Sequence, residues 1–454
     1  MQKKKLVLIQ SSPYDHEKKP IKKSKLYFVG LAMPLLAAMT PDEFEVKIIL
    51  ETIEDIDFDM DVDIVGIGSM GHAVIRSIDI AKEFKKRGKT VFMGGYMVSL
   101  MPEEAKKYCD SVIVGDGEEA YPAMLKDYLR GELKSFYNMP VKLIHTPLPR
   151  FDLILDKKIG DMLPVQAGRG CPKSCSFCSI YCLYKNHYIR RPIEDVVRDI
   201  RQIKDLGFNK FMLLDDNIMS NRKYMMELLD HIIPMKMTWI SQCSIDIGDD
   251  RELLEKLAKS GCMTLSFGLE SIVQESLNSM NKSWAKVSDY KRLIKNIQSV
   301  GIDISTEMVV GADADTKESI RNTADFIKEC KIVVPRFYIL TPIPGTIYHK
   351  EMLEAKRIYI EDMYSYDGSQ AVHIPKNMSP EELTKEYWAL YEKVFEIGNI
   401  MRRTVLRKEF FKAPGRYLFY MAINLYYRYQ IKNRLTPNII WIMRTVKFID
   451  FGRA

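Results

Sequence analysis

Short apolar runs alternate with segments of helical periodicity along the first 135 residues. The segment 75–88 spaces its apolar residues three and four positions apart, as a helix with one buried face requires. Strands that alternate with helices form a parallel sheet with right-handed crossovers. We therefore predict an α/β domain over residues 1–135. Its strand candidates are KLVLIQ (5–10), EVKIIL (45–50), VDIVGIG (62–68), TVFMGG (90–95) and SVIVGDGEE (111–119).

Glycines follow three of these strands. In parallel sheets, ligands bind outside the carboxyl ends of the strands, and glycine there permits positive φ and close approach of the backbone. Plain tight turns are the alternative explanation, because many α/β folds carry glycine at strand ends. The residues concerned are Gly66, Gly68 and Ser69, then Gly94 and Gly95, then Gly115 and Gly117.

Residues 136–162 interrupt the alternation and are predicted to be a linker. Pro140, Pro147 and Pro149 argue against a helix, because proline lacks an N–H and restricts the residue before it.

The alternation resumes over residues 163–348, which we take as a second α/β domain. A helix is expected at 192–207, with Pro192 in its first turn and Gly207 at its end. The strand candidates are LPVQAG (163–168), NKFMLLDD (209–216), MTWISQCSI (237–245), CMTLSFGLE (262–270), IDISTEMVVG (302–311) and PRFYILTP (335–342).

Three cysteines lie within eight residues of the segment GRGCPKSCSFCSI, at Cys171, Cys175 and Cys178. Thiolates bind iron–sulfur clusters or zinc, and a site with three protein ligands leaves one metal position open. A zinc loop completed by Cys182 or His187, or reduced thiols without metal, are the alternatives. Eight cysteines in 454 residues are too few for a disulfide framework.

The C-x3-C-x2-C spacing, the preceding Arg-Gly and the aromatic Phe177 resemble the signature of the radical S-adenosylmethionine (SAM) superfamily. The resemblance implies that Cys171, Cys175 and Cys178 bind three irons of a [4Fe–4S] cluster, whose fourth iron chelates SAM. It also implies that the six strands of 163–348 form a partial (β/α)6 barrel. In such barrels the chemistry gathers at the carboxyl ends of the strands.

Polar residues at the ends of the second and third barrel strands are candidates for SAM binding. The run LLDDN resembles the Asp-Asp-Asn variant of the family's SAM amino-group contact, which implies roles for Asp215, Asp216 and Asn217. Capping of the next helix is the alternative, since Asp and Asn are preferred caps. After the third strand, Gln242 and Ser244 could point into the barrel.

The later strands supply the remaining candidates. Glu270 ends the fourth strand, where the family uses a carboxylate for the SAM ribose or amino group. A structural salt bridge is the alternative, because a carboxylate on an apolar strand end is costly without a partner. The resemblance implies that the backbone near Gly311 and at Leu340–Thr346 packs on adenine, as does Phe177.

Residues 62–122 resemble the cobalamin-binding domain that precedes the barrel in the B12-dependent branch, which makes the first domain Rossmann-like. The resemblance implies that Ser69, Gly94 and Gly95, together with the strand-end Gly115, line the cobalamin. Two features depart from the pattern: SSPYDHEKKP lacks a D-x-H-x-x-G motif, and Met97 stands where many relatives have histidine. We therefore expect cobalamin without a histidine ligand on its lower face, the alternative being a domain without the cofactor.

Residues 349–454 are predicted to be a helical extension that is unusually basic. A helix is expected at 379–411, with Ser379 and Glu382 as a capping box. From 401 to 454 there are twelve Lys or Arg against two acids, whereas the whole chain carries +7. The aromatic and basic runs 417–435 and 438–451 fit a membrane-surface element, and a helical cap on the barrel is the alternative. No nucleic-acid recognition fold is visible.

Composition is that of a globular protein, with 46% apolar and 28% charged residues. No apolar run approaches the ~18 residues of a membrane span, and the apolar run near the start is too short for a signal peptide. We expect a cytoplasmic protein, with peripheral contact to the inner face of the membrane as an option.

The resemblance implies an enzyme that cleaves SAM reductively to a 5′-deoxyadenosyl radical, with C-methylation of a small molecule or lipid if cobalamin is bound. Radical cyclisation, C–C coupling or rearrangement without cobalamin is one alternative. A non-catalytic metal-binding or sensor protein is another. A reducing partner such as flavodoxin or ferredoxin is implied as electron donor.

Overall fold

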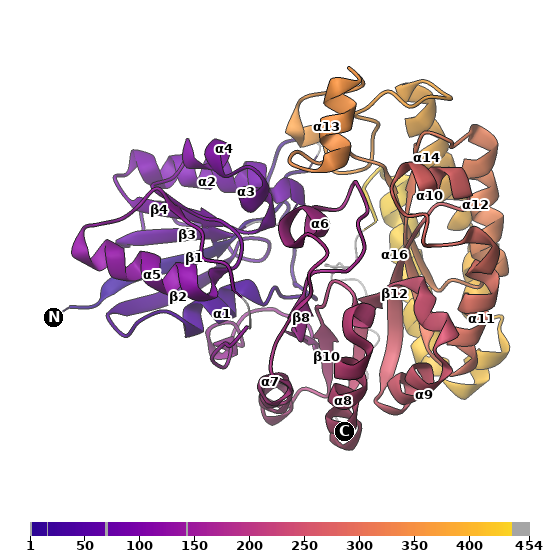
Figure 1. Cartoon of the computed structure of the whole chain (residues 1–454), viewed down its shortest axis with the longest axis horizontal. Coiled ribbons are helices and arrows are strands. Elements are labelled where there is room, and N and C mark those ends of the chain that lie inside the picture. The colour runs from indigo at the N-terminus through magenta and orange to yellow at the C-terminus, as the bar shows by residue number, and fades with distance from the viewer. Residues whose placement is uncertain (1, 16, 69–70, 142–143, 438–454) are drawn as a thin grey trace. The chain divides into compact units, whose positions relative to one another are not determined.

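The computed structural model describes residues 2–15, 17–68, 71–141 and 144–437 (Figure 1). It divides into two compact units that do not follow the order of the chain. The first comprises residues 1–170 and 179–208, and the second comprises residues 171–178 and 209–454. The cysteine-bearing peptide thus belongs to the second unit, while the segments on either side of it belong to the first.

The first unit contains the predicted parallel sheet, in the order β2-β1-β3-β4-β5-β6. Its central strands are almost fully buried, because helices cover both faces: α2, α3 and α4 lie on one side, α1 and α5 on the other (Figure 1). The strands are β1 Lys4–Gln10, β2 Phe44–Leu50, β3 Ile64–Gly68, β4 Thr90–Gly94, β5 Ser111–Ile113 and β6 Phe136–Tyr137. The helices are α1 Ala32–Ala38, α2 Val74–Lys86, α3 Tyr96–Leu100, α4 Pro102–Lys106 and α5 Gly117–Arg130, with a 3-10 turn η1 at Gly71–Ala73.

One glycine of this sheet serves packing instead of a ligand. A Cβ on Gly66 would lie 2.2 Å from the ring of Phe92 and 2.8 Å from Leu8. Glycine is required inside β3 because neighbouring core side chains fill the space beside it. Packing therefore explains Gly66, and Gly68 at the end of β3 is also closely packed, since a Cβ there would lie 2.3 Å from Met33.

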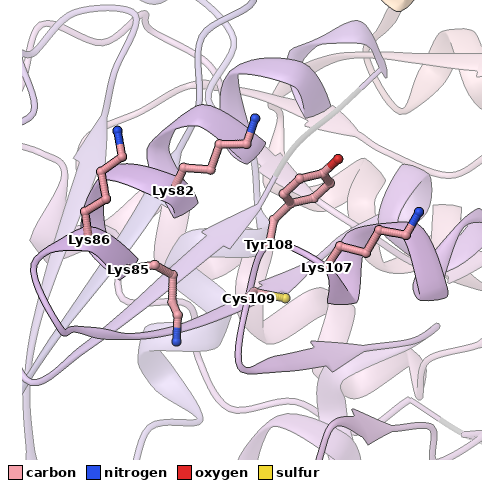
Figure 2. Close-up of a pocket in the computed structure, with 6 residues that line it drawn as sticks. All are labelled: Lys82, Lys85, Lys86, Lys107, Tyr108 and Cys109. Atoms are coloured by element: carbon pink, nitrogen blue, oxygen red, sulfur yellow. The ribbon is translucent and has the colours of Figure 1, made fainter.

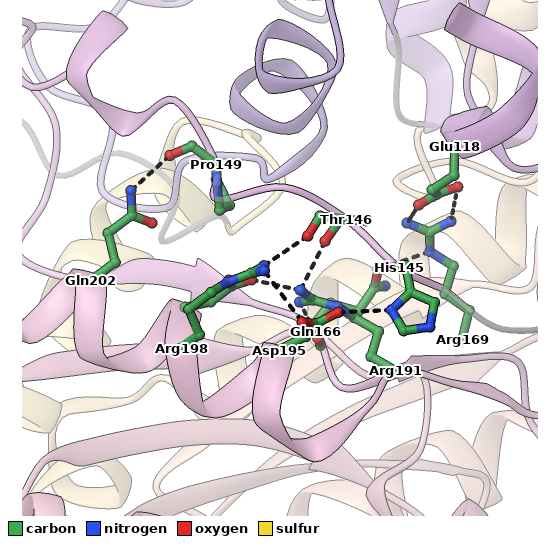
Figure 3. Close-up of polar contacts among 11 residues, drawn as sticks. Glu118, His145, Thr146, Pro149, Gln166, Arg169, Arg191, Asp195, Arg198 and Gln202 are labelled. Carbon is green, nitrogen blue, oxygen red and sulfur yellow. Dashed lines mark hydrogen bonds and ion pairs between the residues drawn. The ribbon is translucent and has the colours of Figure 1, made fainter.

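Within the predicted linker, residues 138–141 and 144–150 form no helix. Side chains of α7 hold this stretch in place (Figure 3). Arg198 donates to the Thr146 carbonyl at 2.7 Å and Gln202 donates to the Pro149 carbonyl at 3.0 Å. The remaining elements of the unit are η2 Phe151–Leu153, β7 Leu163–Val165, β8 Gly168–Arg169, α6 Ser179–Tyr184, β9 Ile189–Arg190 and α7 Ile193–Asp205.

The second unit contains five parallel strands in the order β14-β13-β12-β11-β10, at five of the six positions predicted for the barrel. The sixth predicted strand, first in the chain, is β7. Alternate side chains on each strand are buried under the flanking helices. The strands are β10 Lys210–Leu213, β11 Thr238–Cys243, β12 Cys262–Glu270, β13 Asp303–Val310 and β14 Val334–Ile339.

Helices follow these strands in chain order, as the alternating pattern predicts. They are α8 Arg222–Ile232, α9 Arg251–Lys259, α10 Gln274–Ser279, α11 Tyr290–Ser299, α12 Lys317–Glu329 and α13 Ile347–Glu354. The 3-10 turns are η3 Ile218–Asn221, η4 Ile233–Met235, η5 Ile245–Asp249, η6 Val287–Asp289 and η7 Met363–Ser365.

The long helix predicted at 379–411 is wrong in length. The capping box forms as expected, since the Ser379 hydroxyl accepts from the Glu382 N–H at 3.2 Å and Glu382 accepts from the Ser379 N–H at 3.0 Å. The helix ends early because Phe395 is buried and Glu396 is extended. Three shorter elements result, α14 Pro380–Val394, α15 Ile397–Arg403 and η8 Lys408–Lys412, followed by α16 Pro414–Lys432.

Helix α16 packs against the barrel strands with its aromatic side chains. Tyr417 donates to Asp303 at 3.0 Å, Tyr420 bonds to Thr264 at 2.7 Å, and Asn424 donates to the Val333 carbonyl at 2.8 Å. The cap explanation therefore holds for this face of α16. Residues 438–451, the other half of the predicted membrane element, lie outside the described residues. No helix in the described ranges is long and apolar enough to span a bilayer.

Candidate active site

The three cysteines lie on an irregular peptide between β8 and α6. Cys175 is buried, while Cys171 and Cys178 are half-buried, and none of the eight cysteines forms a disulfide. The Cys178 N–H donates to the Cys175 carbonyl at 3.2 Å, which folds the peptide back on itself. No three His, Cys, Asp or Glu side chains of the described chain converge at metal-binding distance. The case for these cysteines as metal ligands therefore depends on their thiol chemistry and on their spacing in the sequence.

Asn217 links the end of β10 to this peptide. Its amide Nδ2 donates to Cys171 Sγ at 3.6 Å and to Ser244 Oγ at 3.1 Å. Its Oδ1 accepts from the Met219 N–H at 3.1 Å, so Asn217 is also the N-cap of η3. The capping alternative is thus borne out for Asn217, and the same side chain contacts a candidate cluster ligand.

The other polar candidates of the early strands differ in burial. Asp215 is fully buried and Asp216 half-buried, directly after β10. Gln242 is exposed on β11, whereas its neighbours Ser241 and Cys243 are buried. The Ser244 N–H donates to Asn217 Oδ1 at 3.1 Å, so the ends of β10 and β11 are joined by hydrogen bonds.

Glu270 ends β12 in a strained conformation, with a φ of 61°. The Lys282 ammonium donates to its Oε1 at 2.8 Å and to the Gly268 carbonyl at 2.8 Å. Both side chains of the pair are less than a tenth exposed. One oxygen of Glu270 therefore forms the salt bridge that is the alternative to ligand binding. Its positive φ is a separate observation, because strained non-glycine residues cluster at functional sites.

Two residues that sequence reasoning missed lie beside the cysteines. Lys282 and Trp284 both interact with Cys175, and the buried indole N–H of Trp284 has no hydrogen-bond partner of standard geometry in the described structure. Burial raises the pKa of the Cys175 thiol, and the Lys282 charge opposes that rise. Burial also lowers the pKa of Lys282, but Glu270 and Cys175 outweigh it and the net shift is upward. The sequence has a lysine and a tryptophan after GLES, but nothing in the sequence relates them to the cysteines.

The adenine-side candidates lie after β13 and β14. Gly311 has a φ of 95°, and a Cβ there would lie 2.4 Å from Leu383. Its carbonyl accepts from the imidazole Nε2 of the fully buried His373 at 3.0 Å. The Leu340 N–H donates to the Val310 carbonyl at 2.9 Å, and Phe177 is half-buried on the cysteine peptide.

Gly94, Gly95 and Gly115 lie at or just after the carboxyl ends of β4 and β5 of the first unit, and we call them the glycine edge. Gly95 has a φ of 107° and precedes α3. Gly115 has a φ of 79°, and no atom of the described residues lies within 4 Å of the point that a Cβ would occupy there. Ser99 connects the two: its hydroxyl donates to the Gly95 carbonyl at 2.9 Å and accepts from the Gly115 N–H at 2.8 Å. Ser69 lies outside the described residues.

Two side chains at positions where a cobalamin ligand is considered, Met97 and Asp15, have structural roles. Met97 is 2% exposed and belongs to the core of the unit. Asp15 accepts from the N–H groups of Glu17 and Lys19, each at 2.9 Å, and so stabilises a turn. His16 lies outside the described residues.

A depression lined by lysines lies elsewhere on the first unit (Figure 2). Its residues belong to the end of α2 and to the segment before β5, at the amino ends of the strands and so opposite the glycine edge. Its lysines have carboxylate partners, for example Lys85 with Asp110 and Lys107 with Glu104. The depression is lined by Lys82, Lys85, Lys86, Lys107, Tyr108 and Cys109.

Comparison with known proteins assigns both regions. A family model described as "B12 binding domain" matches residues 21–125, and one described as "Radical SAM superfamily" matches residues 165–327. The bacteriochlorophyllide d C-12(1)-methyltransferase of Chlorobaculum tepidum is 32% identical over 75% of this chain and 76% of its own length. The chain belongs to the radical SAM superfamily. It is a radical SAM enzyme of the branch that carries a B12-binding domain.

A second relative and a solved structure agree with this assignment of the radical SAM enzyme. The bacteriochlorophyllide d C-8(2)-methyltransferase of the same organism is 32% identical over 83% of this chain and 87% of its own. The radical SAM methyltransferase TsrM of Kitasatospora setae, solved with cobalamin and a [4Fe-4S] cluster, has a TM-score of 0.64 at 18% identity, covering 78% of this chain and 75% of its own. The predicted order of a Rossmann-like domain and a radical SAM barrel is confirmed.

The residues of the radical SAM enzyme fit the cofactors of the family. Three thiols with the Trp284 N–H and the Lys282 charge beside them are suited to a negatively charged iron–sulfur cluster. The open space at Gly115 is suited to close approach of a large ligand to the backbone.

Proposed function

We propose that the protein is a cobalamin-dependent radical SAM methyltransferase that methylates a carbon atom of a small molecule or lipid. The observation that carries the proposal is the 32% identity to two methyltransferases across 75% and 83% of the chain. The family match to both a B12-binding and a radical SAM domain supports it. Bacteriochlorophyllide d is the first substrate to test, because both relatives are named for it.

We propose roles for individual residues on the basis of the family resemblance, supported by the contacts described above. We assign Cys171, Cys175 and Cys178 as ligands of the [4Fe–4S] cluster. The glycine edge and Ser69 are assigned to cobalamin. SAM is assigned to the strand-end set Phe177, Asp215, Asp216, Asn217, Gln242, Ser244, Glu270, Gly311 and Leu340.

When bound, the cluster supplies an electron for cleavage of SAM, and cobalamin supplies the methyl group. The protein's own residues prepare the site for this chemistry. Asn217 holds Cys171, and Lys282 places a positive charge beside Cys175 while it fixes one oxygen of Glu270. The other oxygen of Glu270 stays available to a SAM hydroxyl or ammonium. Burial of Cys175 and Lys282 excludes water from this side.

The proposal is tested by anaerobic reconstitution followed by measurement of iron, sulfide and cobalamin content. With a reductant and SAM we expect 5′-deoxyadenosine, and with substrate we expect transfer of labelled methyl from SAM. Formation of 5′-deoxyadenosine without cobalamin or methyl transfer would favour radical cyclisation, coupling or rearrangement. No 5′-deoxyadenosine at all would favour a sensor or structural metal protein.

Reductive cleavage of SAM also requires an electron donor. We propose a low-potential carrier such as flavodoxin or ferredoxin. The test compares the 5′-deoxyadenosine rate with each reduced carrier and with a chemical reductant, and a carrier that gives no product is excluded.

We further propose that the C-terminal region contacts an anionic membrane surface, which would suit a lipid or pigment substrate. Leu418, Leu425 and Tyr429 form an exposed stripe on the outer face of α16, and Phe411 is 84% exposed beside Lys412. An apolar stripe with flanking lysines is typical of interfacial helices. Co-sedimentation with phosphatidylglycerol vesicles should fall on L425E/Y429E substitution, and equal binding of the variant would exclude this surface.

A further inference from the structure

The segment that precedes the cysteine peptide is anchored, within the first unit, to the loop after Gly115. Arg169, two residues before Cys171, donates to Asp116 at 2.7 Å and to the two oxygens of Glu118 at 2.6 and 3.0 Å (Figure 3 draws the Glu118 bonds). Asp116 and Glu118 follow Gly115 at the beginning of α5. The peptide therefore leaves the first unit from a residue tied to the glycine edge.

The segment that follows the cysteine peptide contacts the same edge of the first unit. Helix α6 begins at Ser179, directly after Cys178, and packs against α3, which begins directly after Gly95. Tyr184 at the end of α6 donates to Asp116 Oδ1 at 2.8 Å. Strands β8 and β9, which lie before and after the cysteine peptide in the chain, pair antiparallel with each other.

These contacts form one continuous network with the glycine edge. Ser99 bonds to both Gly95 and Gly115, and Asp116 bonds to both Arg169 and Tyr184. Within the first unit, the two glycine loops are therefore joined to each other and to both segments that flank the cysteine peptide.

The network is charged and largely shielded from water, so its geometry is well defined. The side chains of Arg169, Asp116 and Glu118 are 17%, 9% and 5% exposed. A forked guanidinium–carboxylate pair fixes orientation as well as distance, and removal of one partner leaves a buried charge uncompensated.

We propose that Arg169, Asp116, Glu118 and Tyr184 are positioning residues that couple occupancy of the cobalamin site to the geometry of the cysteine peptide. A ligand that fills the space at Gly115 orders the loop that carries Asp116 and Glu118, and these residues order both ends of the peptide. By linkage, a loaded cluster must strengthen cobalamin binding by the same factor by which cobalamin strengthens cluster binding. The inference rests on the proposed function.

The test is a set of anaerobic hydroxocobalamin titrations, each followed by absorbance, on protein with and without a reconstituted cluster. In the wild type we expect the Kd for cobalamin to be about five- to tenfold lower when the cluster is loaded. In Glu118→Gln, and more mildly in Tyr184→Phe, this ratio should move toward one. Glu119→Gln is the matched control, because it makes the same charge change on an exposed residue of the same helical turn and should keep the wild-type ratio.

The outcomes separate this inference from the proposed function. A purely structural role for the network would weaken both affinities equally and leave the ratio unchanged, which would overturn the inference alone. A wild-type ratio of one with both cofactors bound would do the same. Failure of the wild type to bind cobalamin would overturn both. Tyr184→Phe removes only a hydroxyl, so it decides the matter if Glu118→Gln does not fold.

Discussion

Side chains surround the cysteine peptide, whereas the glycine edge of the first unit offers mainly backbone. Near Cys175 the structure places an ammonium and an indole N–H, and Cys171 receives an amide N–H from Asn217. At the glycine edge, the space beside the Cα of Gly115 is open, and Ser99 bonds to both Gly95 and Gly115. The cysteine peptide is thus suited to select a ligand by its charge, and the glycine edge is suited to select a ligand by its shape.

The sharpest way to break this comparison is to remove a thiol. Cys175→Ala should abolish iron and sulfide incorporation and 5′-deoxyadenosine formation, because only two of the three soft ligands remain. Cobalamin should still bind, at the affinity of the cluster-free wild type. Cys182→Ala is the control and should retain the cluster. A cluster of normal iron content in Cys175→Ala, or its loss in Cys182→Ala, would contradict the ligand assignment.

The glycine edge should respond to the smallest possible side chain. Gly115→Ala adds a methyl group where a ligand is expected and strains a positive φ, so we expect cobalamin affinity to fall about tenfold while cluster content is unchanged. Gly131→Ala is the matched control, since Gly131 also has positive φ and open space but lies at the far end of α5. Both variants should lose about 1 kcal/mol of folding stability. Equal cobalamin affinity in the two variants would show that Gly115 is a turn residue alone.

Charge control at the cysteine peptide is tested by Lys282→Met. Loss of a positive charge beside the cluster should make reduction harder and shift the midpoint potential negative by tens of millivolts, measured by EPR-monitored titration. Lys286→Met removes the same charge from an exposed residue nearby and should not shift the potential. Cobalamin absorbance should be unaffected in both. An unchanged potential in a folded, cluster-loaded Lys282→Met would remove Lys282 from the site.

Sequence reasoning reached the two regions unequally, for physical reasons. The three thiols can be found from the sequence because they lie close together in the chain. The strands can be found because burial imposes a regular spacing on the apolar residues. Lys282 and Trp284 were missed because they approach Cys175 only through tertiary folding after α10. The helix predicted at 379–411 was too long, since its periodicity continues across Phe395 while the chain turns there to bury that ring.

The same asymmetry appears among the glycines. Gly66 and Gly115 look alike in the sequence, both at the end of an apolar run. Only the structure separates them, because Phe92 and Leu8 fill the space at Gly66 and no described residue fills it at Gly115. Neighbours across a sheet come from distant parts of the chain, so spacing along the sequence carries no information about them.

The smallest expected effect concerns the acid stability of the second unit around His373. Burial lowers the pKa of His373, whose neutral imidazole bonds to the Gly311 carbonyl. The unfolded state therefore binds more protons below the ordinary histidine pKa of about 6.5, and stability should fall as pH drops from there toward the folded pKa, by at most about 1.4 kcal/mol per pH unit. Urea unfolding at pH 7.5 and 5.5 should show a smaller difference in His373→Asn than in the wild type, while exposed His231→Asn keeps the wild-type difference. If His373→Asn loses as much stability on acidification as the wild type, the buried imidazole is not the group that titrates.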